Sequence, residues 1–303
     1  MSQRVLRRNR IKEDEPGPSQ SPEVIGDVVL DANEVPSFGE ILQCAENYSS
    51  AHQSLATFMV NKGVLTRKEF YLCFIRNVVS MNLKRNPEVV PKIACSVEDL
   101  DSLVSKLFSK LNPRLSELGL RLTSLADEET GREMVVLVSE DVFPKDISCI
   151  SGFSADELLL FARYLPQLVD GCGQCESSWA LNEATKLPNP LTLVKAQSFL
   201  DKLASFGWIS EKDDTIRLEP RAIAELEPVL TTSYGCNTCI LCQKVVVRKD
   251  IAVICDSCDV QIHRHCWKKY AASSEANEIS CPGRGSNECG RMFSKSDVAE
   301  TLA

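Results

Sequence analysis

The chain has 303 residues, of which 44% are hydrophobic and 25% are charged, and this length predicts about two domains. Its formal net charge of −8 argues against a surface that binds nucleic acid over its whole area, although a local basic patch remains compatible with it. No apolar run approaches the roughly 18 residues of a membrane span. The basic residues near the start have no apolar segment after them, so we expect neither a membrane protein nor a secretory signal.

The first segment, residues 1–37, is predicted to be a disordered tail, because a basic run and an acidic, proline-bearing stretch follow each other without apolar periodicity. The basic run is compatible with a nuclear address or a nucleic-acid arm, but a solvated tail is the commoner reading. A second tail is expected at residues 294–303.

Residues 38–150 predict helices followed by a hairpin. Helical spacing covers residues 38–60, and Thr66 begins a second helix through a capping-box spacing to Glu69. A third amphipathic helix follows Val97 and is expected to stop at Pro113. Apolar runs at 118–125 and 133–138 then flank a turn. This order is typical of a winged helix.

Residues 151–234 repeat the pattern, which predicts a second winged helix. Ser154 and Glu157 have capping-box spacing, Pro190 opens a helix that ends at Gly207, and a short hairpin follows. The helix between Pro190 and Gly207 has few basic residues, and the hairpin that follows it is acidic. Because phosphate contacts need net positive charge, we expect both units to bind proteins, with DNA contacted at most indirectly.

Fourteen cysteines are unusual in a chain without a visible secretory signal, and in a reducing compartment such a cluster favours metal binding over disulfides. Cys172 and Cys175 have a redox spacing without the strand-then-helix context of a thioredoxin, so we interpret them as incidental thiols, with a redox or metal role as the alternative. Eight other cysteines lie between residues 236 and 289, together with two of the three histidines.

Four ligand pairs in residues 235–293 predict two zinc ions, because zinc takes four tetrahedral nitrogen or sulfur ligands. Two ligand assignments have an alternative. Cys236 could replace a member of the first pair, Cys239 and Cys242, and His265 could replace His263 in the third pair, His263 and Cys266. Linear pairing is also an alternative, but the connection lengths favour a cross-brace in which pairs one and three bind one ion and pairs two and four bind the other. The expected sites are Cys239, Cys242, His263 and Cys266 for the first ion, and Cys255, Cys258, Cys281 and Cys289 for the second.

Cross-braced modules with this ligand order include RING-type ubiquitin-ligase domains and PHD-type histone readers. A RING has no catalytic nucleophile and acts by positioning a conjugating enzyme that carries ubiquitin as a thioester. The residues expected to contact that enzyme are Ile240, Leu241, Trp267, Pro282 and Arg291. A histone reader needs an aromatic cage instead, and Ile279 stands where a PHD finger usually has an aromatic residue. A purely structural zinc module is the third alternative.

The whole order resembles a known family, the non-SMC element one subunits of the Smc five–six chromosome-maintenance complex. The resemblance is carried by residues 97–138, by residues 195–227, and by Cys239-Ile-Leu-Cys through His263-Arg-His-Cys-Trp-Lys-Lys-Tyr270. It implies a mainly α fold with small β hairpins, in which tandem winged-helix domains precede a zinc-stabilised, cross-braced RING-like domain.

The resemblance also implies a function: a nuclear DNA-repair subunit with RING-type ubiquitin-ligase activity. It implies a MAGE-domain partner that binds through the winged helices and promotes a weak ligase activity. It also implies a kleisin subunit that associates with this pair. The chain departs from the family at its last ligand pair, which is usually Cys-Pro-x-Cys. Here five extra residues separate Cys281 and Cys289, in a loop that contacts the conjugating enzyme in a RING.

Overall fold

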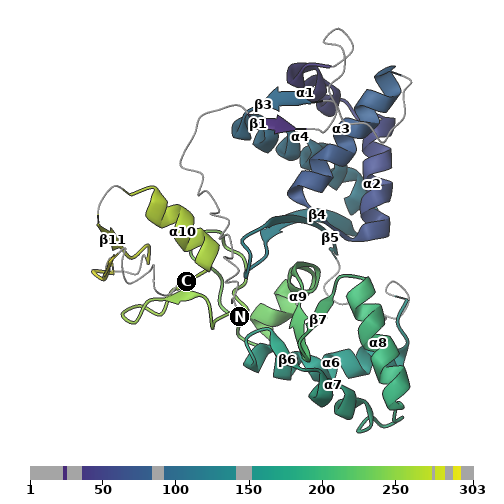
Figure 1. The fold of residues 1–303 in the computed structure, drawn as a ribbon, viewed down its shortest axis with the longest axis vertical. Coiled ribbons are helices and arrows are strands. Elements are labelled where there is room, and N and C mark those ends of the chain that lie inside the picture. Colours follow the sequence, from purple (N-terminus) through teal and green to yellow (C-terminus); the bar gives the residue numbers. More distant parts are fainter. Residues whose placement is uncertain are drawn as a thin grey trace, which may run out of the picture.

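The computed structural model describes residues 23–25, 36–83, 92–140, 152–274, 277–283 and 289–294. Within these ranges the chain forms two helical units and a C-terminal module with short strands (Figure 1). This arrangement confirms the predicted fold class. Among the helices of the described ranges, none combines the length and apolar character that crossing a membrane requires.

The first unit combines helices with a three-stranded antiparallel sheet in the order β2-β5-β4. Its hairpin β4–β5 is the wing of a winged helix. Phe74, Leu103 and Leu107 are fully buried in its core, because they lie on the inner faces of α3 and α4. The elements are α1 (Phe38–Glu46), α2 (Ser50–Lys62), β2 (Val64–Thr66), α3 (Arg67–Leu83), β3 (Ile93–Cys95), α4 (Val97–Ser116), β4 (Leu120–Ala126) and β5 (Glu133–Ser139).

Three local predictions for this unit need correction or addition. The helical spacing over residues 38–60 belongs to two helices, α1 and α2, rather than one. Helix α4 continues past Pro113 to Ser116, because the Asn112 side chain bonds the backbone of Leu122 in β4 and holds the last turn in place. The capping box at Thr66 is confirmed, since the Thr66 amide donates to Glu69 Oε2 at 2.9 Å and the Glu69 amide donates to Thr66 Oγ1 at 3.1 Å.

Part of the segment predicted to be disordered is ordered. Strand β1 (Glu23–Ile25) pairs antiparallel with β3, and the Ile25 side chain is buried in the first core. Burial of this apolar residue and the pairing with β3 together oppose the entropy cost of ordering the short strand. The prediction for residues 1–22 and 26–35 lies outside the described residues, as does that for 295–303, whereas Ser294 belongs to strand β12 (Met292–Ser294).

The second unit has the same topology, with the sheet order β6-β8-β7. Asp213 and Asp214 both have positive φ, at 51° and 58°, and form the two-residue turn that joins β7 to β8. Helix α8 begins at Leu193 with Thr192 as its N-cap, so Pro190 lies before the helix rather than at its start. The elements are α6 (Ala155–Asp170), β6 (Gln174–Glu176), α7 (Ser177–Ala184), α8 (Leu193–Ser205), β7 (Ile209–Lys212), β8 (Thr215–Leu218) and α9 (Pro220–Thr232).

Helix α9 joins the two units, because it packs on the sheet of the first unit. Ala224 of α9 forms a small buried cluster with Val136 and Val138 of β5. The Ser139 amide of β5 donates to the Glu225 carboxylate of α9 at 3.2 Å. The two winged helices are therefore held together by apolar packing with a polar border.

The C-terminal module begins inside the second unit. Cys236, Val245 and Val247 belong to the second unit's core, whereas Val246, Ile262 and Trp267 form the module's own small core. The loop between β4 and β5 also reaches this module (Figure 1). The remaining elements are β9 (Val253–Ile254), β10 (Gln261–Ile262), α10 (Arg264–Ala272), β11 (Glu278–Ser280) and β12.

Candidate metal centres and the adjoining pocket

Two groups of ligand atoms come together in the C-terminal module. In each group, all the sulfur and nitrogen atoms lie within 4.8 Å of one another. Pairs one and three of the sequence meet, as do pairs two and four, so the arrangement is interleaved rather than linear. The groups are Cys239, Cys242, His263 and Cys266, and Cys255, Cys258, Cys281 and Cys289.

The first group is assembled from a tight turn and the start of α10. The Gln243 amide donates to the Cys239 carbonyl at 2.8 Å, and this turn presents Cys239 and Cys242 on one side. His263 is the N-cap residue of α10, and Cys266 lies in the first turn of that helix. His263 Nδ1 lies 3.3 Å from Cys242 Sγ and 3.9 Å from Cys266 Sγ.

The other ring nitrogen of His263 determines which nitrogen is available as a ligand. His263 Nε2 lies 3.0 Å from the Val245 carbonyl oxygen, so Nε2 carries the hydrogen and donates it to that oxygen. In the neutral ring Nδ1 therefore keeps its lone pair, which points toward the thiols. His265 stacks on His263 with a centroid separation of 5.0 Å and is not a member of the group.

The second group repeats the same turn. The Asp259 amide donates to the Cys255 carbonyl at 2.8 Å, as Gln243 does in the first group, and both residues have positive φ. The Cys255 and Cys289 sulfurs are 3.7 Å apart, and so are those of Cys258 and Cys281. Two thiolates on one zinc ion lie about 3.8 Å apart, given tetrahedral geometry at the usual zinc–sulfur length. The sulfur positions thus fit a tetrahedral ion.

One thiol in each group has a lowered pKa, whereas the pKa values of Cys258, Cys266 and Cys281 are raised. The pKa of Cys239 is well below its usual value, because the Cys242 and Cys266 thiols donate hydrogen bonds to its sulfur. Burial acts to raise the pKa of Cys255, but the backbone amides of Ser257 and Cys258 outweigh burial and lower this pKa to about 7. Thiolates are the ligand form of cysteine, so each group contains one sulfur that is readily available to a metal ion.

The thiols outside these two groups have different surroundings. Cys236 is buried in the second unit's core, and burial raises its pKa. Cys175 of β6 is also buried there, and burial raises its pKa to about 11, whereas Cys172 lies in the turn before β6. Within the described ranges, none of these three thiols joins a group that can hold a metal.

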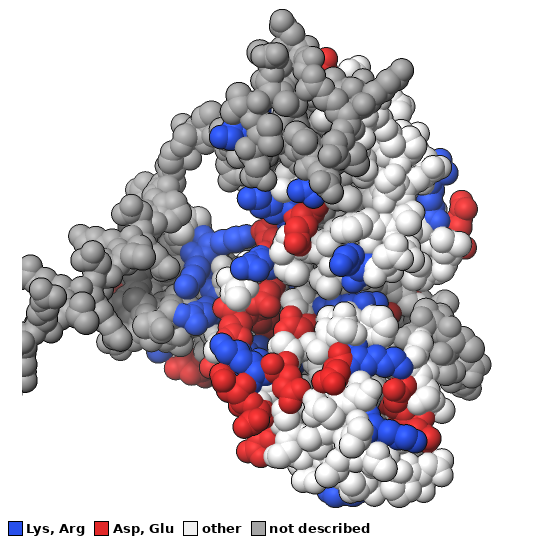
Figure 2. Space-filling view, turned by 45° about the vertical axis from the view of Figure 1, so that its right-hand side comes forward, with Lys and Arg blue, Asp and Glu red and all other residues white. Residues whose placement is uncertain are grey.

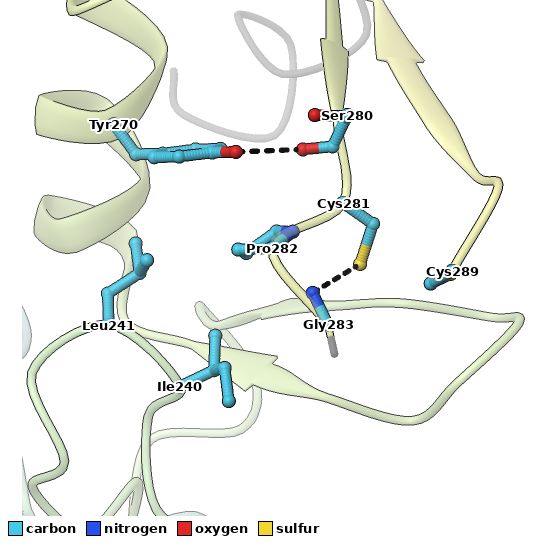
Figure 3. A pocket seen from close by; sticks show the side chains of 8 residues that line it. All are labelled: Ile240, Leu241, Tyr270, Ser280, Cys281, Pro282, Gly283 and Cys289. Carbon is cyan, nitrogen blue, oxygen red and sulfur yellow. Dashed lines mark hydrogen bonds between the residues drawn. The ribbon is translucent and has the colours of Figure 1, made fainter. Parts of the chain in front are cut away.

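A pocket of about 520 Å³ lies beside the two groups (Figure 3). Leu241 and Ile240 come from the first turn, Tyr270 comes from α10, and Pro282 follows a cysteine of the second group. The Tyr270 hydroxyl donates to the Ser280 carbonyl at 3.2 Å and so ties the helix to the strand across the pocket. The eight lining residues are Ile240, Leu241, Tyr270, Ser280, Cys281, Pro282, Gly283 and Cys289.

Three of the five residues expected to contact a conjugating enzyme lie in this pocket, namely Ile240, Leu241 and Pro282. Trp267 does not, because its side chain is fully buried and packs edge-on against Phe293. The expectation that Trp267 contacts a partner is therefore wrong, and the same burial excludes it from an aromatic cage. Arg291 is exposed and pairs with Asp256 at 3.4 Å.

The winged-helix surfaces are mixed or acidic rather than basic. Lys202 of α8 pairs with Glu157 at 3.1 Å, and the exposed wing of the second unit carries Glu211, Asp213 and Asp214. Figure 2 shows acidic side chains gathered on the lower unit in that view, beside a more basic area around the junction with the C-terminal module. These charges do not favour phosphate contacts by the second unit.

Two residues of the site were not identified from the sequence. Tyr270 lies one helical turn after Cys266. This spacing places it on the same helix face as a ligand, so the sequence could have indicated it. Glu128, in the loop between β4 and β5, accepts hydrogen bonds from the backbone of the C-terminal module. Nothing in the local sequence indicates that contact, because the two segments are 119 positions apart.

Comparison with known proteins adds evidence of a different kind. No protein-family model matches the chain. A protein of Drosophila melanogaster named "Non-structural maintenance of chromosomes element 1 homolog" is 28% identical over 188 residues, which cover 60% of this chain and 76% of that protein. The Homo sapiens protein of the same name is 27% identical over 194 residues, 61% of this chain and 70% of that protein.

A solved structure supports the fold independently. A chain from a structure titled "Nse1-Nse3-Nse4 complex" superposes with a TM-score of 0.60 at 18% identity and covers 81% of this chain and 97% of that chain. The sequence matches, the shared fold and the paired cysteine–histidine groups agree with one another: the chain is similar in sequence to proteins named non-structural maintenance of chromosomes element 1 homolog, and it shares its fold with a chain of the Nse1-Nse3-Nse4 complex structure.

Proposed function

We propose that the chain is a nuclear, zinc-binding, RING-type ubiquitin-ligase subunit of a chromosome-maintenance complex. Two zinc ions would be held by the two cysteine–histidine groups, with the ligands predicted from the sequence. The donor set supports zinc, since three thiolates with one imidazole and four thiolates are both common in structural zinc sites. Zinc in these sites holds the fold and supplies no reaction step.

The observation that carries the ligase proposal is the pocket beside both groups. Ile240, Leu241, Tyr270 and Pro282 present apolar side chains at its edge, and the Leu241 side chain is 36% exposed. This is the position in which a RING grips a conjugating enzyme with its two zinc loops and the intervening helix. The chain then acts by holding the ubiquitin thioester in a reactive pose for an incoming amine.

The described ends of the insertion between Cys281 and Cys289 lie close together. The Cys289 amide donates to the Gly283 carbonyl at 3.3 Å, so the two ends of the insertion meet. Pro282 keeps its place in the pocket lining despite the five additional residues. This closure supports a partner surface at Pro282 like that of a RING with a short loop.

For partners, we propose a MAGE-domain subunit bound through the winged helices and a kleisin subunit that associates with this pair. The support is the family resemblance together with the superposition on a chain of a three-component complex. The acidic wing of the second unit supports protein rather than direct DNA contacts there.

Discharge of ubiquitin from conjugating enzymes tests the ligase proposal. The full chain, alone and co-purified with a MAGE-domain partner, is added to a panel of ubiquitin-loaded enzymes with free lysine as acceptor. We expect discharge by at least one enzyme, faster with the partner, and loss of this acceleration in Ile240→Ala and Leu241→Ala. Ile254→Ala is the matched control, since Ile254 is 43% exposed in the same module but does not line the pocket.

No discharge across the panel would reject the ligase function, as would equal losses in Leu241→Ala and Ile254→Ala. A structural zinc module is the second candidate, favoured by the core that residues 236–247 share with the second winged helix. It predicts that Leu241→Ala preserves function in the assembled complex while Cys258→Ser does not. A histone reader is disfavoured by the burial of Trp267.

A further inference from the structure

The loop between β4 and β5 places a buried carboxylate against the first metal-binding group. Glu128 is 7% exposed, and its two oxygens accept the Val247 amide at 3.1 Å and the Arg248 amide at 2.9 Å. Glu128 Oε2 also lies 3.9 Å from His263 Nε2. A carboxylate of the first winged helix therefore lies next to a residue of the C-terminal module that can bind metal.

These contacts form a continuous path to the ligand atom. Glu128 fixes the backbone at Val247 and Arg248, two and three residues after Val245. The Val245 carbonyl in turn accepts the hydrogen of His263 Nε2. Outer groups of this kind hold the imidazole in one tautomer and one orientation.

The loop is built to hold this position. Asp127 Oδ1 accepts from the Glu129 amide at 3.0 Å and from the Thr130 amide at 2.7 Å, which fixes the turn around Glu128. Gly131 lies so close to the module that a Cβ atom there would be 2.9 Å from His265 Cβ. Only a residue without a side chain permits this approach.

Further charged contacts surround the loop. Lys269 of α10 donates to Glu133 at 2.9 Å, Arg217 of β8 donates to Glu129 at 2.8 Å, and Arg248 lies 3.4 Å from the same carboxylate. The wing thus contacts both the second unit and the C-terminal module. A displacement of the wing would remove the support of the first metal group and these ion pairs together.

We propose that Glu128 is a positioning residue for the metal bound at the first group, and that metal occupancy there and docking of the wing stabilise each other. The coupling is reciprocal, because any interaction that favours the docked wing when metal is bound must favour metal binding when the wing is docked. The inference rests on the proposed zinc centres and is independent of ligase activity.

Metal release from the full-length chain tests this directly. Zinc ions per chain are counted by native mass spectrometry at intervals after a chelator is added. We expect Glu128→Gln to lose one ion about 10- to 100-fold faster than the wild type, with the second ion released at the wild-type rate. Glutamine has nearly the same size but no charge and can accept only one of the two amides well. The matched control is Glu117→Gln, which removes the same charge from an exposed carboxylate at the end of α4, outside the wing.

Cobalt(II) identifies which ion is lost. Sites with three and four thiolates differ in their charge-transfer absorption, and we expect Glu128→Gln to lose the band of the three-thiolate site. Equal release from Glu128→Gln and wild type, loss from the four-thiolate site, or equal acceleration in Glu117→Gln would overturn the proposal. A wild-type chain without zinc would instead overturn the zinc centres themselves.

A second measurement does not depend on folding of the Glu128 variant. Hydrogen exchange is compared between the wild type and Cys266→Ser, which removes a ligand of the first group alone. We expect faster exchange at residues 126–133 of the wing, with exchange in α3 and α4 unchanged. Unchanged exchange in the wing would show that metal and wing docking are not coupled.

Discussion

Gly283 lies so close to Cys258 that a Cβ atom at position 283 would be 2.7 Å from the Cys258 sulfur. The Gly283 amide also lies 3.4 Å from Cys281 Sγ and donates a hydrogen bond to it. The backbone at Gly283 therefore packs directly on the second ligand group, and the position tolerates no side chain.

Gly283→Ala should weaken the second metal centre. The added methyl group must displace Cys258 or the backbone that supports Cys281, and either movement distorts the tetrahedron of sulfurs. We expect purified Gly283→Ala to contain about one zinc ion per chain, with the remaining ion at the first group. Gly290→Ala serves as control, because a Cβ there meets no atom within 4 Å. Two tightly held ions in Gly283→Ala would contradict the prediction.

Removal of metal should unfold the C-terminal module and leave the winged helices folded. The module's own core is small, and metal binding supplies on the order of 10 kcal/mol per ion to such folds. With chelator present, we expect the seven cysteines of the two groups to react with an alkylating reagent, whereas Cys175 and Cys236 stay protected in the second core. Protection of all seven thiols after chelation would show that the module folds without metal.

Glu157 should make the second unit more stable at neutral pH than in acid. Burial acts to raise the pKa of Glu157, but hydrogen bonds from Ser154 and from Lys202 outweigh burial and lower it. The charged carboxylate thus stabilises the fold above its unfolded pKa, and this contribution is lost as the pH falls through the lower, folded pKa.

We therefore expect Glu157→Gln to lower the free energy of unfolding by about 1 kcal/mol at pH 7, and by progressively less below pH 4. Urea unfolding followed by tryptophan fluorescence measures the difference, since Trp179 and Trp208 pack in this unit. Asp156→Asn is the control, because Asp156 makes only an exposed contact with Asn189. A loss of unfolding free energy of equal size at pH 7 and below pH 4 would rule out the charge of Glu157 as the cause of the loss.

Ala224→Asp should separate the two winged helices. Ala224 is buried against Val136 and Val138, and a carboxylate placed there would be desolvated without a partner. We expect a larger radius of gyration by X-ray scattering, with the helix content preserved because this cluster is separate from both main cores. Ala204→Asp on exposed α8 should leave the radius unchanged.

The sequence by itself determined the local features of this protein. Capping boxes at Thr66 and Ser154 are local patterns, and the second has its predicted bonds at 2.6 and 3.2 Å. The spacing of cysteine pairs and the lengths between them predicted which pairs meet, because a tight turn and a single ion constrain few residues. The alternation of helices and hairpins likewise predicted two winged helices, since periodicity reports the buried face of each element.

Only the tertiary structure decided which side chains remain accessible and how the three parts contact one another. Trp267 looked like a partner-binding residue but is the centre of the module's core, and Tyr270 takes a place in the pocket instead. Glu128 lies beside His263 although the two are 135 positions apart in the chain. Local periodicity cannot predict a contact between residues this far apart. Burial and long-range contacts depend on the packing of elements from all three parts, so the local sequence carries no record of them.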